Sequence, residues 1–352
     1  MKKSGMGAAI FSHLSFFLLM NLVFNTTIYA QQPFYQGKSV RLIAGTTAGT
    51  VTDLWPRLIA DHMGKHIAGN PGVVVQNMPG AGGVIAANYV YNVAKPDGLT
   101  LGTVSPSIYV DQIVGRKEVQ FDWGKFNWIG TPEQYDYVFI MRADSPYKSI
   151  DDIRKATEPP KCGAPGTGSH LYQIPKLMEE TVGAKFLIVA GYQGATDVDL
   201  AIERGEMHCR SVTVTAYLGR EPFLSWGKKG FVRALVQTGR KPSPSLPEVP
   251  TIYELMNRYK TPDAARRLAT LVLAPGEFGR PILAPPGVPA ERVKILREAL
   301  NKTLRDPELL SEAKKREWPV APMAGEELES LAKEVVAQPP EVVQRLKKLL
   351  GE

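Results

Sequence analysis

Two short segments rich in glycine and hydroxyl groups are the strongest candidates for chemistry in this sequence. The first, GTTAGT, spans residues 45–50 and follows an apolar run at 40–44, and the second, PGTGSH, spans 165–170 and follows a run at 161–164. Each precedes a stretch of helical periodicity, which predicts a strand, a tight turn and a helix N-terminus. Free backbone N–H groups and the positive end of the helix dipole then face one point, which suits an anion.

Asp53 has two possible roles that the sequence leaves open. Its spacing from Thr50 is that of a capping box, in which each side chain satisfies a free N–H of the helix. Contact with a ligand is the alternative, and we expect the structural role. The helix start is open as well: a start at Val51 puts Pro56 in the second turn, where it costs a hydrogen bond, and a start at Leu54 does not.

Motifs of nucleotide-binding and catalytic sites are incomplete. PGAGG at 79–83 lacks the third glycine of GxGxxG, because Ile85 stands at that position. PGTGSH lacks the GK[ST] ending of a P-loop, and the pair Ser169–His170 has neither a GxSxG elbow nor a matching acid. We therefore expect no enzyme activity, and an exported hydrolase is the weaker alternative.

Histidine and cysteine show no metal-site spacing, so we expect no metal and no cofactor. His62 and His66 lie four residues apart, and we expect both at the surface. Cys162 and Cys209 fall in the first and third strands of one β-α-β-α-β unit, strands that are commonly neighbours in a doubly wound sheet. A disulfide and two buried free thiols both remain open.

Composition predicts a soluble, globular protein, and the N-terminal segment predicts that it is exported. The 352 residues are 44% hydrophobic and 22% charged, which allows a sizeable core and about two domains. Residues 1–30 predict a signal peptide cleaved near Ala30, with an uncleaved anchor as the alternative. The sequence has 42 basic and 35 acidic residues, and removal of the two lysines of the signal peptide leaves a net charge of +5. The basic residues are scattered, so we expect no nucleic-acid partner.

Two β-α-β-α-β patterns organise the chain, one over residues 40–105 and one over 161–214. Their short connections predict parallel sheets covered by helices. RKPSPSLPEVP at 240–250 is too rich in proline for a helix or a strand, and we expect it to return the chain to the first unit. The expected division is lobe 1 at 31–135 and 236–352 and lobe 2 at 136–235, with hinge crossings near Tyr135 and Gln237.

Several motifs together resemble one family. They are RLIAGTTAGTVTD, VVVQNMPGAGG, KPDGLTLGT, GAPGTGSH, VAGYQGATDVDLAIERGE, PEVPT and APPGVPAERVKILREALNKTLRDPE. In this order they are similar to the Bug/TctC family, the extracytoplasmic solute receptors of tripartite tricarboxylate transporters, over nearly the whole mature chain. The resemblance implies an α/β fold, a two-lobed type II periplasmic binding protein in which each lobe is a mostly parallel sheet flanked by helices.

The resemblance also implies a set of ligand-binding residues. In the family, both loops hold a ligand carboxylate largely through backbone amides, small hydroxyls and ordered water. The matching positions are Thr46, Thr47, Ala48, Gly49, Thr50, Asp53, Ser105, Gly166, Thr167, Gly168, Ser169, His170 and Tyr192. Ala48-Gly49 replaces the usual glycine pair, and GEMHCRS lacks the usual acidic residue after GE, so the ligand can differ from the commonest dicarboxylates and amino acids.

We therefore expect a monomeric periplasmic receptor that binds a small carboxylate between its lobes and passes it to membrane transporter subunits. A sensor that presents the ligand to a two-component kinase is the alternative. Charge-assisted hydrogen bonds contribute about 1.5–3 kcal/mol each, and a micromolar complex needs about 8 kcal/mol. Several amide and hydroxyl bonds can supply this free energy without a buried arginine.

Overall fold

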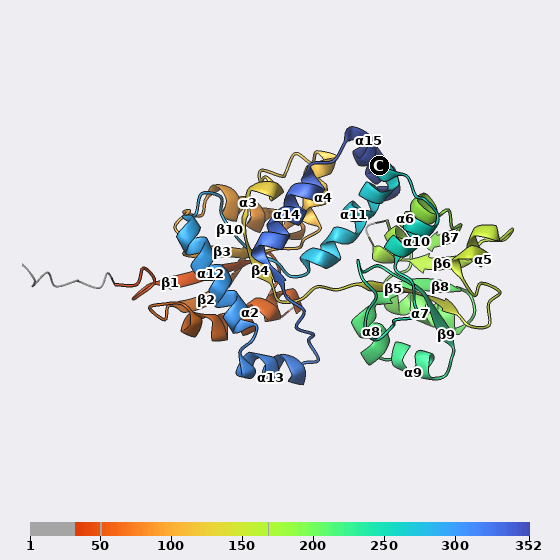
Figure 1. Ribbon diagram of the computed structural model, residues 1–352, viewed down its shortest axis with the longest axis horizontal. Helices are drawn as coiled ribbons and strands as arrows, with labels where there is room; N and C mark the ends of the chain where they lie inside the picture. Colours follow the sequence, from red (N-terminus) through yellow and green to blue (C-terminus); the bar gives the residue numbers. More distant parts are fainter. Residues whose placement is uncertain (1–31, 50, 168) are drawn as a thin grey trace, which may run out of the picture.

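The computed structural model describes residues 32–49, 51–167 and 169–352, which form two lobes side by side (Figure 1). The expected signal peptide, Thr50 and Gly168 lie outside these ranges. No helix within them combines the length and the apolar character that a membrane crossing requires.

The first lobe is built around a six-stranded sheet in the order β11-β4-β10-β3-β1-β2. Its strands are β1 (Ser39–Ala44), β2 (Gly72–Asn77), β3 (Thr100–Thr103), β4 (Asn127–Thr131), β10 (Ile282–Ala284) and β11 (Met323–Ala324). The apolar run of β1 is buried, and β1 pairs in parallel with both β2 and β3. The crossover helices α2 (Val51–Met63) and α3 (Val84–Asn92) make these parallel pairings possible.

The second lobe contains a five-stranded sheet in the order β7-β6-β8-β5-β9. Its strands are β5 (Tyr137–Arg142), β6 (Lys161–Ala164), β7 (Leu187–Ala190), β8 (Cys209–Thr213) and β9 (Val232–Gln237). The strands β6, β7 and β8 are parallel, and β5 runs antiparallel to both β8 and β9. Helices α5 (Ile150–Lys155), α6 (His170–Val182) and α7 (Ala195–Glu203) connect its strands.

Both sheets are mixed, and the predicted two-lobed α/β fold is confirmed. The βαβ units supply parallel strands, and the antiparallel pairings are those of β10 and β11 in the first sheet and of β5 in the second. Cys162 and Cys209 are register partners on β6 and β8, with Cα atoms 4.8 Å apart and a disulfide between them. The prediction that these strands are neighbours is therefore confirmed.

Helices from the C-terminal part of the chain join the two lobes. They are α10 (Ile252–Arg258), α11 (Asp263–Phe278), α12 (Ala290–Thr303), α13 (Pro307–Lys315), α14 (Gly325–Val336) and α15 (Pro340–Leu350). Helices α12, α13 and α14 pack on the first lobe, and α10 packs on α6 of the second. Both α11 and α15 contact α6 and also elements of the first lobe. Figure 1 shows α11 between the two sheets and α15 above it at the top of the view. The exact lobe boundaries remain a prediction.

The chain crosses from β4 to β5 directly beneath the end of α11. Gly279 has φ +63°, and a Cβ at this position would lie 1.6 Å from the carbonyl oxygen of Glu133. A Cβ at Gly276 would lie 2.3 Å from the carbonyl oxygen of Tyr135. Two glycines thus allow the backbones of the helix and the crossing strand to touch.

The remaining short elements complete the connections. They are η1 (Gly64–His66), η2 (Ala81–Gly83), α4 (Ile108–Val114), η3 (Trp123–Lys125), α8 (Val214–Gly219) and α9 (Phe223–Lys228).

Candidate ligand-binding site

Asp53 anchors the first glycine loop from inside the protein. The residue is 1% exposed, and its Oδ2 accepts hydrogen bonds from the Gly49 N–H at 2.8 Å and from Arg57 Nε at 2.9 Å. Its Oδ1 accepts from Arg57 Nη2 at 2.9 Å and from Asn77 Nδ2 at 2.6 Å. Asn77 Nδ2 also donates to the Thr46 carbonyl at 3.0 Å. Asp53 thus positions the loop.

The guanidinium of Arg57 beside Asp53 is the main reason why the pKa of that carboxyl falls to about 2. The N–H of Gly49 and the amide of Asn77 lower the pKa further, against the effect of burial. Helix α2 begins at Val51, the earlier of the two predicted starts, so Pro56 lies inside it. Thr47, Ala48 and Gly49 remain exposed at the turn, and Gly49 has φ +83°, which suits glycine.

The second loop is fixed by Ser169 and His170 at the start of α6. Ser169 Oγ caps the helix by accepting from the Leu171 N–H at 3.2 Å. The His170 ring stacks on Tyr137 with centroids 4.4 Å apart, and the His170 carbonyl accepts from Ser211 Oγ at 3.0 Å. Burial, helped by the nearby Arg210, lowers the pKa of His170 to about 4. This side chain is therefore neutral at physiological pH.

Tyr192 lies at the end of β7 and packs against the neighbouring strand. Its N–H donates to the Ala164 carbonyl at 3.4 Å, and its ring carbon Cε2 would lie 3.2 Å from a Cβ at Gly163. The half-buried ring thus covers the glycine of β6.

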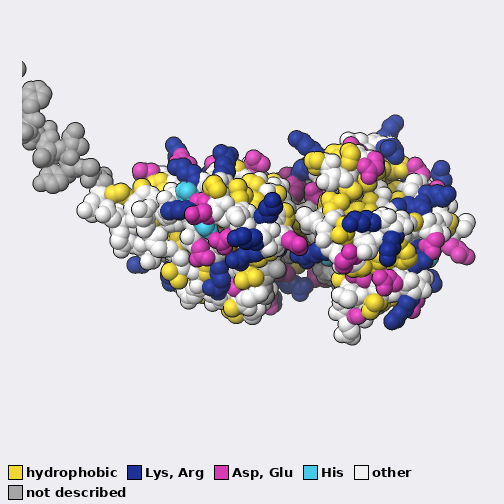
Figure 2. Space-filling view, turned by 90° about the horizontal axis from the view of Figure 1, so that it is seen from below, with side chains coloured by type: hydrophobic (Ala, Val, Ile, Leu, Met, Phe, Trp, Pro, Cys, Tyr) yellow, Lys and Arg dark blue, Asp and Glu magenta, His cyan; other side chains and the backbone are white. Residues whose placement is uncertain are grey.

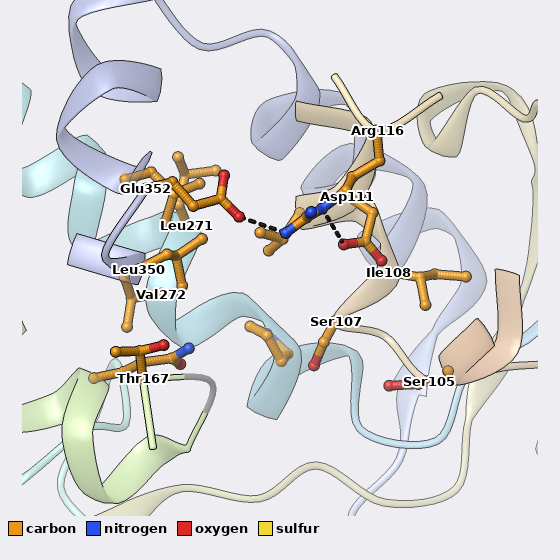
Figure 3. A pocket seen from close by; sticks show the side chains of 15 residues that line it. Ser105, Ser107, Ile108, Asp111, Arg116, Thr167, Leu271, Val272, Leu350 and Glu352 are labelled. Carbon is orange, nitrogen blue, oxygen red and sulfur yellow. Dashed lines mark hydrogen bonds and ion pairs between the residues drawn. The ribbon is translucent and has the colours of Figure 1, made fainter. Parts of the chain in front are cut away.

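A cavity of about 360 Å³ lies between the lobes (Figure 3). Ser105 and Ser107 of the first lobe and Thr167 and Gln173 of the second line it. The structure thus brings together two of the residues predicted from the sequence, Ser105 and Thr167. The other predicted residues that the structure describes are not among those lining it: Thr46, Thr47, Ala48, Gly49, Asp53, Gly166, Ser169, His170 and Tyr192. The volume falls within the range of small-molecule sites, about 300–1,000 Å³.

Most of the cavity wall comes from helices that the sequence did not point to. Its apolar side chains are Ile108, Val110, Leu271, Val272, Pro275, Leu346 and Leu350, from α4, α11 and α15. Its charged side chains are Asp111, Arg116 and Glu352. These segments are more than two hundred residues apart in places, and no local motif connects them. We predicted from the sequence that no buried arginine is required, and the arginine that lines the cavity, Arg116, has a side chain that is 53% exposed.

His62 and His66 lie where α2 and η1 meet α13. His62 is 7% exposed, with its Nε2 3.3 Å from Glu312 Oε1. The expectation that it is a surface residue was wrong, because α13 packs over this face of α2. His66 Nε2 lies 2.9 Å from Asp306 Oδ2. Figure 2 shows histidine side chains beside acidic and basic ones on this lobe.

The same cluster includes three groups of metal-ligand type. His62, Asp306 and Glu308 each place one potential ligand atom within 4.8 Å of the others. The Lys65 ammonium, however, lies 2.7 Å from both carboxylates and compensates part of their charge. Lys65 is also the main reason why the pKa of Asp306 is held well below its usual range. The cluster is best described as an ionic contact between helices.

The family assignment follows from comparison with known proteins. The model of the tripartite tricarboxylate transporter family receptor, TctC, matches residues 56–348. The chain belongs to the TctC family. A curated relative from Cupriavidus necator, the UPF0065 protein in the gbd 5′ region, is 29% identical over 322 residues and covers 90% of each chain. The resemblance predicted from the sequence motifs is confirmed, and the family is one of solute-binding receptors, not of enzymes.

Solved structures share the fold. A ligand-free TctC solute-binding protein from Polaromonas aligns with a TM-score of 0.69 and 20% identity, over 90% of this chain and 99% of that one. MatC from Rhodopseudomonas palustris, solved with malate, aligns with a TM-score of 0.52 and 20% identity, over 89% of this chain and 99% of that one. An R. palustris protein solved with adipate aligns with a TM-score of 0.54 and 21% identity, over 90% of this chain and 98% of that one. These likenesses establish the two-lobed fold of this TctC protein.

Proposed function

We propose that this protein is a periplasmic receptor that binds a small organic carboxylate between its lobes and delivers it to the membrane subunits of a tripartite transporter. The observation that carries this proposal is the interlobe cavity, in which hydroxyl groups from both lobes and one guanidinium face each other across apolar walls. Residues 1–30 act as the export signal in this proposal, and the receptor is a monomer.

Two kinds of support favour a carboxylate over other ligands. Hydroxyl groups, helix N-termini and the arginine are donors or positive dipole ends, which stabilise an anion better than a neutral sugar. MatC was solved with malate and a second R. palustris protein with adipate, both of them carboxylates. These proteins share the fold of this chain, and their ligands support the chemical class alone.

We assign the ligand contacts to two groups of residues. Ser105 and Thr167 line the cavity from opposite lobes and contact the ligand directly. The exposed turn of Thr47, Ala48 and Gly49, held by Asp53, moves over the ligand when the lobes close. Ser169 and His170 position the second loop through the helix cap of Ser169 and the stacking of His170 on Tyr137.

The test is ligand binding measured by thermal shift and calorimetry. The panel contains malate, adipate, benzoate and hexanoate, with glucose and ATP as the other ligand classes. A ligand at 100 times its Kd should add about 2.7 kcal/mol of stability. Small-angle scattering should show a smaller radius of gyration in its presence, because the lobes close.

Variants show whether the proposed contacts are the relevant ones. Thr167→Val and Ser105→Ala should weaken binding while leaving the melting temperature of the free protein nearly unchanged. Thr157→Val, an exposed threonine beyond α5, serves as the matched control. If no acid in the panel shifts the melting temperature while glucose or ATP does, the carboxylate proposal is wrong.

A further inference from the structure

Arg116 is the only cationic side chain among the cavity-lining residues that the structure describes. Two carboxylates already hold it. Its Nη2 donates to Glu352 Oε1, and its Nε lies 3.7 Å from Asp111 Oδ1. Figure 3 shows the guanidinium between these two acids, within the cavity. This guanidinium, which could form an ion pair with a ligand carboxylate, is therefore already engaged by the protein itself.

The two partners of Arg116 come from different parts of the chain. Asp111 lies on α4, and Arg116 follows the end of that helix, where its N–H donates to the Asp111 carbonyl at 2.9 Å. Glu352 follows α15, and its N–H donates to the Lys347 carbonyl at 2.9 Å. A Cβ at Gly351 would lie 3.5 Å from Thr167 Cγ2, so this end of the chain lies against the second-lobe loop. Gly351 thus lies beside the loop of the second lobe, while the neighbouring Glu352 pairs with an arginine of the first lobe.

Apart from the polar side chains of Ser105, Ser107, Thr167 and Gln173, the rest of the cavity wall is apolar. Val272 and Leu350 face it from α11 and α15, and Ile108 faces it from α4 (Figure 3). A hydroxyl or a second carboxylate placed against these side chains would lose its water without gaining a hydrogen bond, which is unfavourable. The walls therefore suit a ligand with one charged end and a hydrocarbon body.

We infer that the cavity selects monocarboxylates with an apolar body, whose carboxylate pairs with Arg116 by displacing Glu352. This inference rests on the proposed function. The side chain of Arg116 is 53% exposed and that of Glu352 is 35% exposed, so their ion pair is weak and exchangeable. A guanidinium binds a carboxylate through two parallel N–H···O hydrogen bonds. An incoming acid can therefore replace Glu352 and form both of these hydrogen bonds with Arg116.

Charge explains why a second carboxylate on the ligand is disfavoured. The side chains of Asp111, Arg116 and Glu352 together carry a net charge of −1. A dianion brings its second carboxylate close to Asp111, which remains in place, and to the displaced Glu352. Like charges at short distance repel. Glu352 therefore competes with the ligand for Arg116. This competition lowers the affinity of the cavity for every acid, and most of all for diacids.

The experiment is calorimetry on the full chain with benzoate, hexanoate and malate, and with benzamide as the neutral analogue of benzoate. The wild type should bind benzoate or hexanoate more tightly than malate and should not bind benzamide. Arg116→Gln should weaken benzoate binding at least tenfold, and Arg116→Lys should retain part of the affinity. Glu352→Gln should tighten it roughly twofold to fivefold, because the resident pair is an exposed one.

Two matched controls separate this role from general charge effects. Arg345→Gln and Glu341→Gln remove charges from α15 outside the cavity lining, and neither should change the affinity. Circular dichroism melting checks that each variant is folded.

An unchanged benzoate affinity in folded Arg116→Gln overturns the inference. A weaker benzoate affinity in Glu352→Gln also overturns it, and so does a wild-type protein that binds malate more tightly than benzoate. A wild-type protein that binds none of these acids overturns the proposed function itself, which is a different result from acid binding that does not depend on Arg116.

Discussion

Replacing Asp53 by asparagine tests how the first loop is held. All described partners of this carboxylate are donors, namely Arg57, the Gly49 N–H and the Asn77 amide. An asparagine would turn one oxygen into an NH₂ group facing those donors, and it would leave the Arg57 charge unpaired. The pKa of Asp53 falls from 3.8 to about 2, and this shift corresponds to about 2 kcal/mol. With the unsatisfied donors added, we expect Asp53→Asn to destabilise the protein by about 2–4 kcal/mol.

The pH dependence of that difference identifies the carboxylate as its source. The folded-state pKa lies below the ordinary value, so the contribution is fully present above about pH 4 and is lost as the pH falls through 2. Urea unfolding followed by circular dichroism at pH 7 and pH 3 measures the difference in the free energy of unfolding between wild type and variant. By linkage, about half of the charge-dependent difference between wild type and variant should disappear at pH 3.

Asp61→Asn provides the matched control, because Asp61 is an exposed aspartate on the same helix. It should change the free energy of unfolding by no more than about 0.5 kcal/mol at either pH. If Asp53→Asn were as mild as this control, or if its effect were equal at pH 7 and pH 3, Asp53 would not anchor the loop through its charge.

Three further predictions concern the glycine contact, the disulfide and the buried histidine. Gly279→Ala should destabilise by more than about 2 kcal/mol in urea unfolding, because its Cβ would overlap a backbone carbonyl, whereas Gly37→Ala, at φ +69° in open space, should cost about 1 kcal/mol. Cys162 and Cys209 are fully buried, so mass spectrometry after alkylation should detect reduction only in denaturant, and reduction should cost about 4 kcal/mol for a separation of 47 residues. The free energy of unfolding should fall from pH 6.5 to pH 4, because the unfolded chain binds a proton at His170 more readily, and His170→Gln should reduce that slope.

The sequence was informative wherever the structure depends on short-range patterns. Apolar runs followed by glycine loops predicted both βαβ units, because a parallel sheet requires that order of elements. The same topology predicted that Cys162 and Cys209 lie on neighbouring strands. The capping spacing directed attention to Asp53, and the Arg57 contact four residues later is also a short-range helix pattern.

Contacts between distant segments could not be predicted in this way. Asn77 holds Asp53 because β2 pairs with β1, and a single sequence does not reveal that pairing of side chains. Arg116 and Glu352 are 236 residues apart and meet because α15 packs against α4. His62 looked exposed because the position of α13 depends on tertiary packing.

The position of α11 and α15 limits how the lobes can move. One continuous hydrophobic cluster contains Trp128 of the first sheet, Phe278 of α11 and Leu177 of α6 in the second lobe. A close-packed interior of this kind does not deform continuously. If the lobes close on a ligand as we propose, closure has to preserve this cluster. Leu271 and Val272 of α11 already form part of the apolar wall of the cavity. We therefore predict that a ligand with a hydrocarbon body enters the cavity before the lobes close.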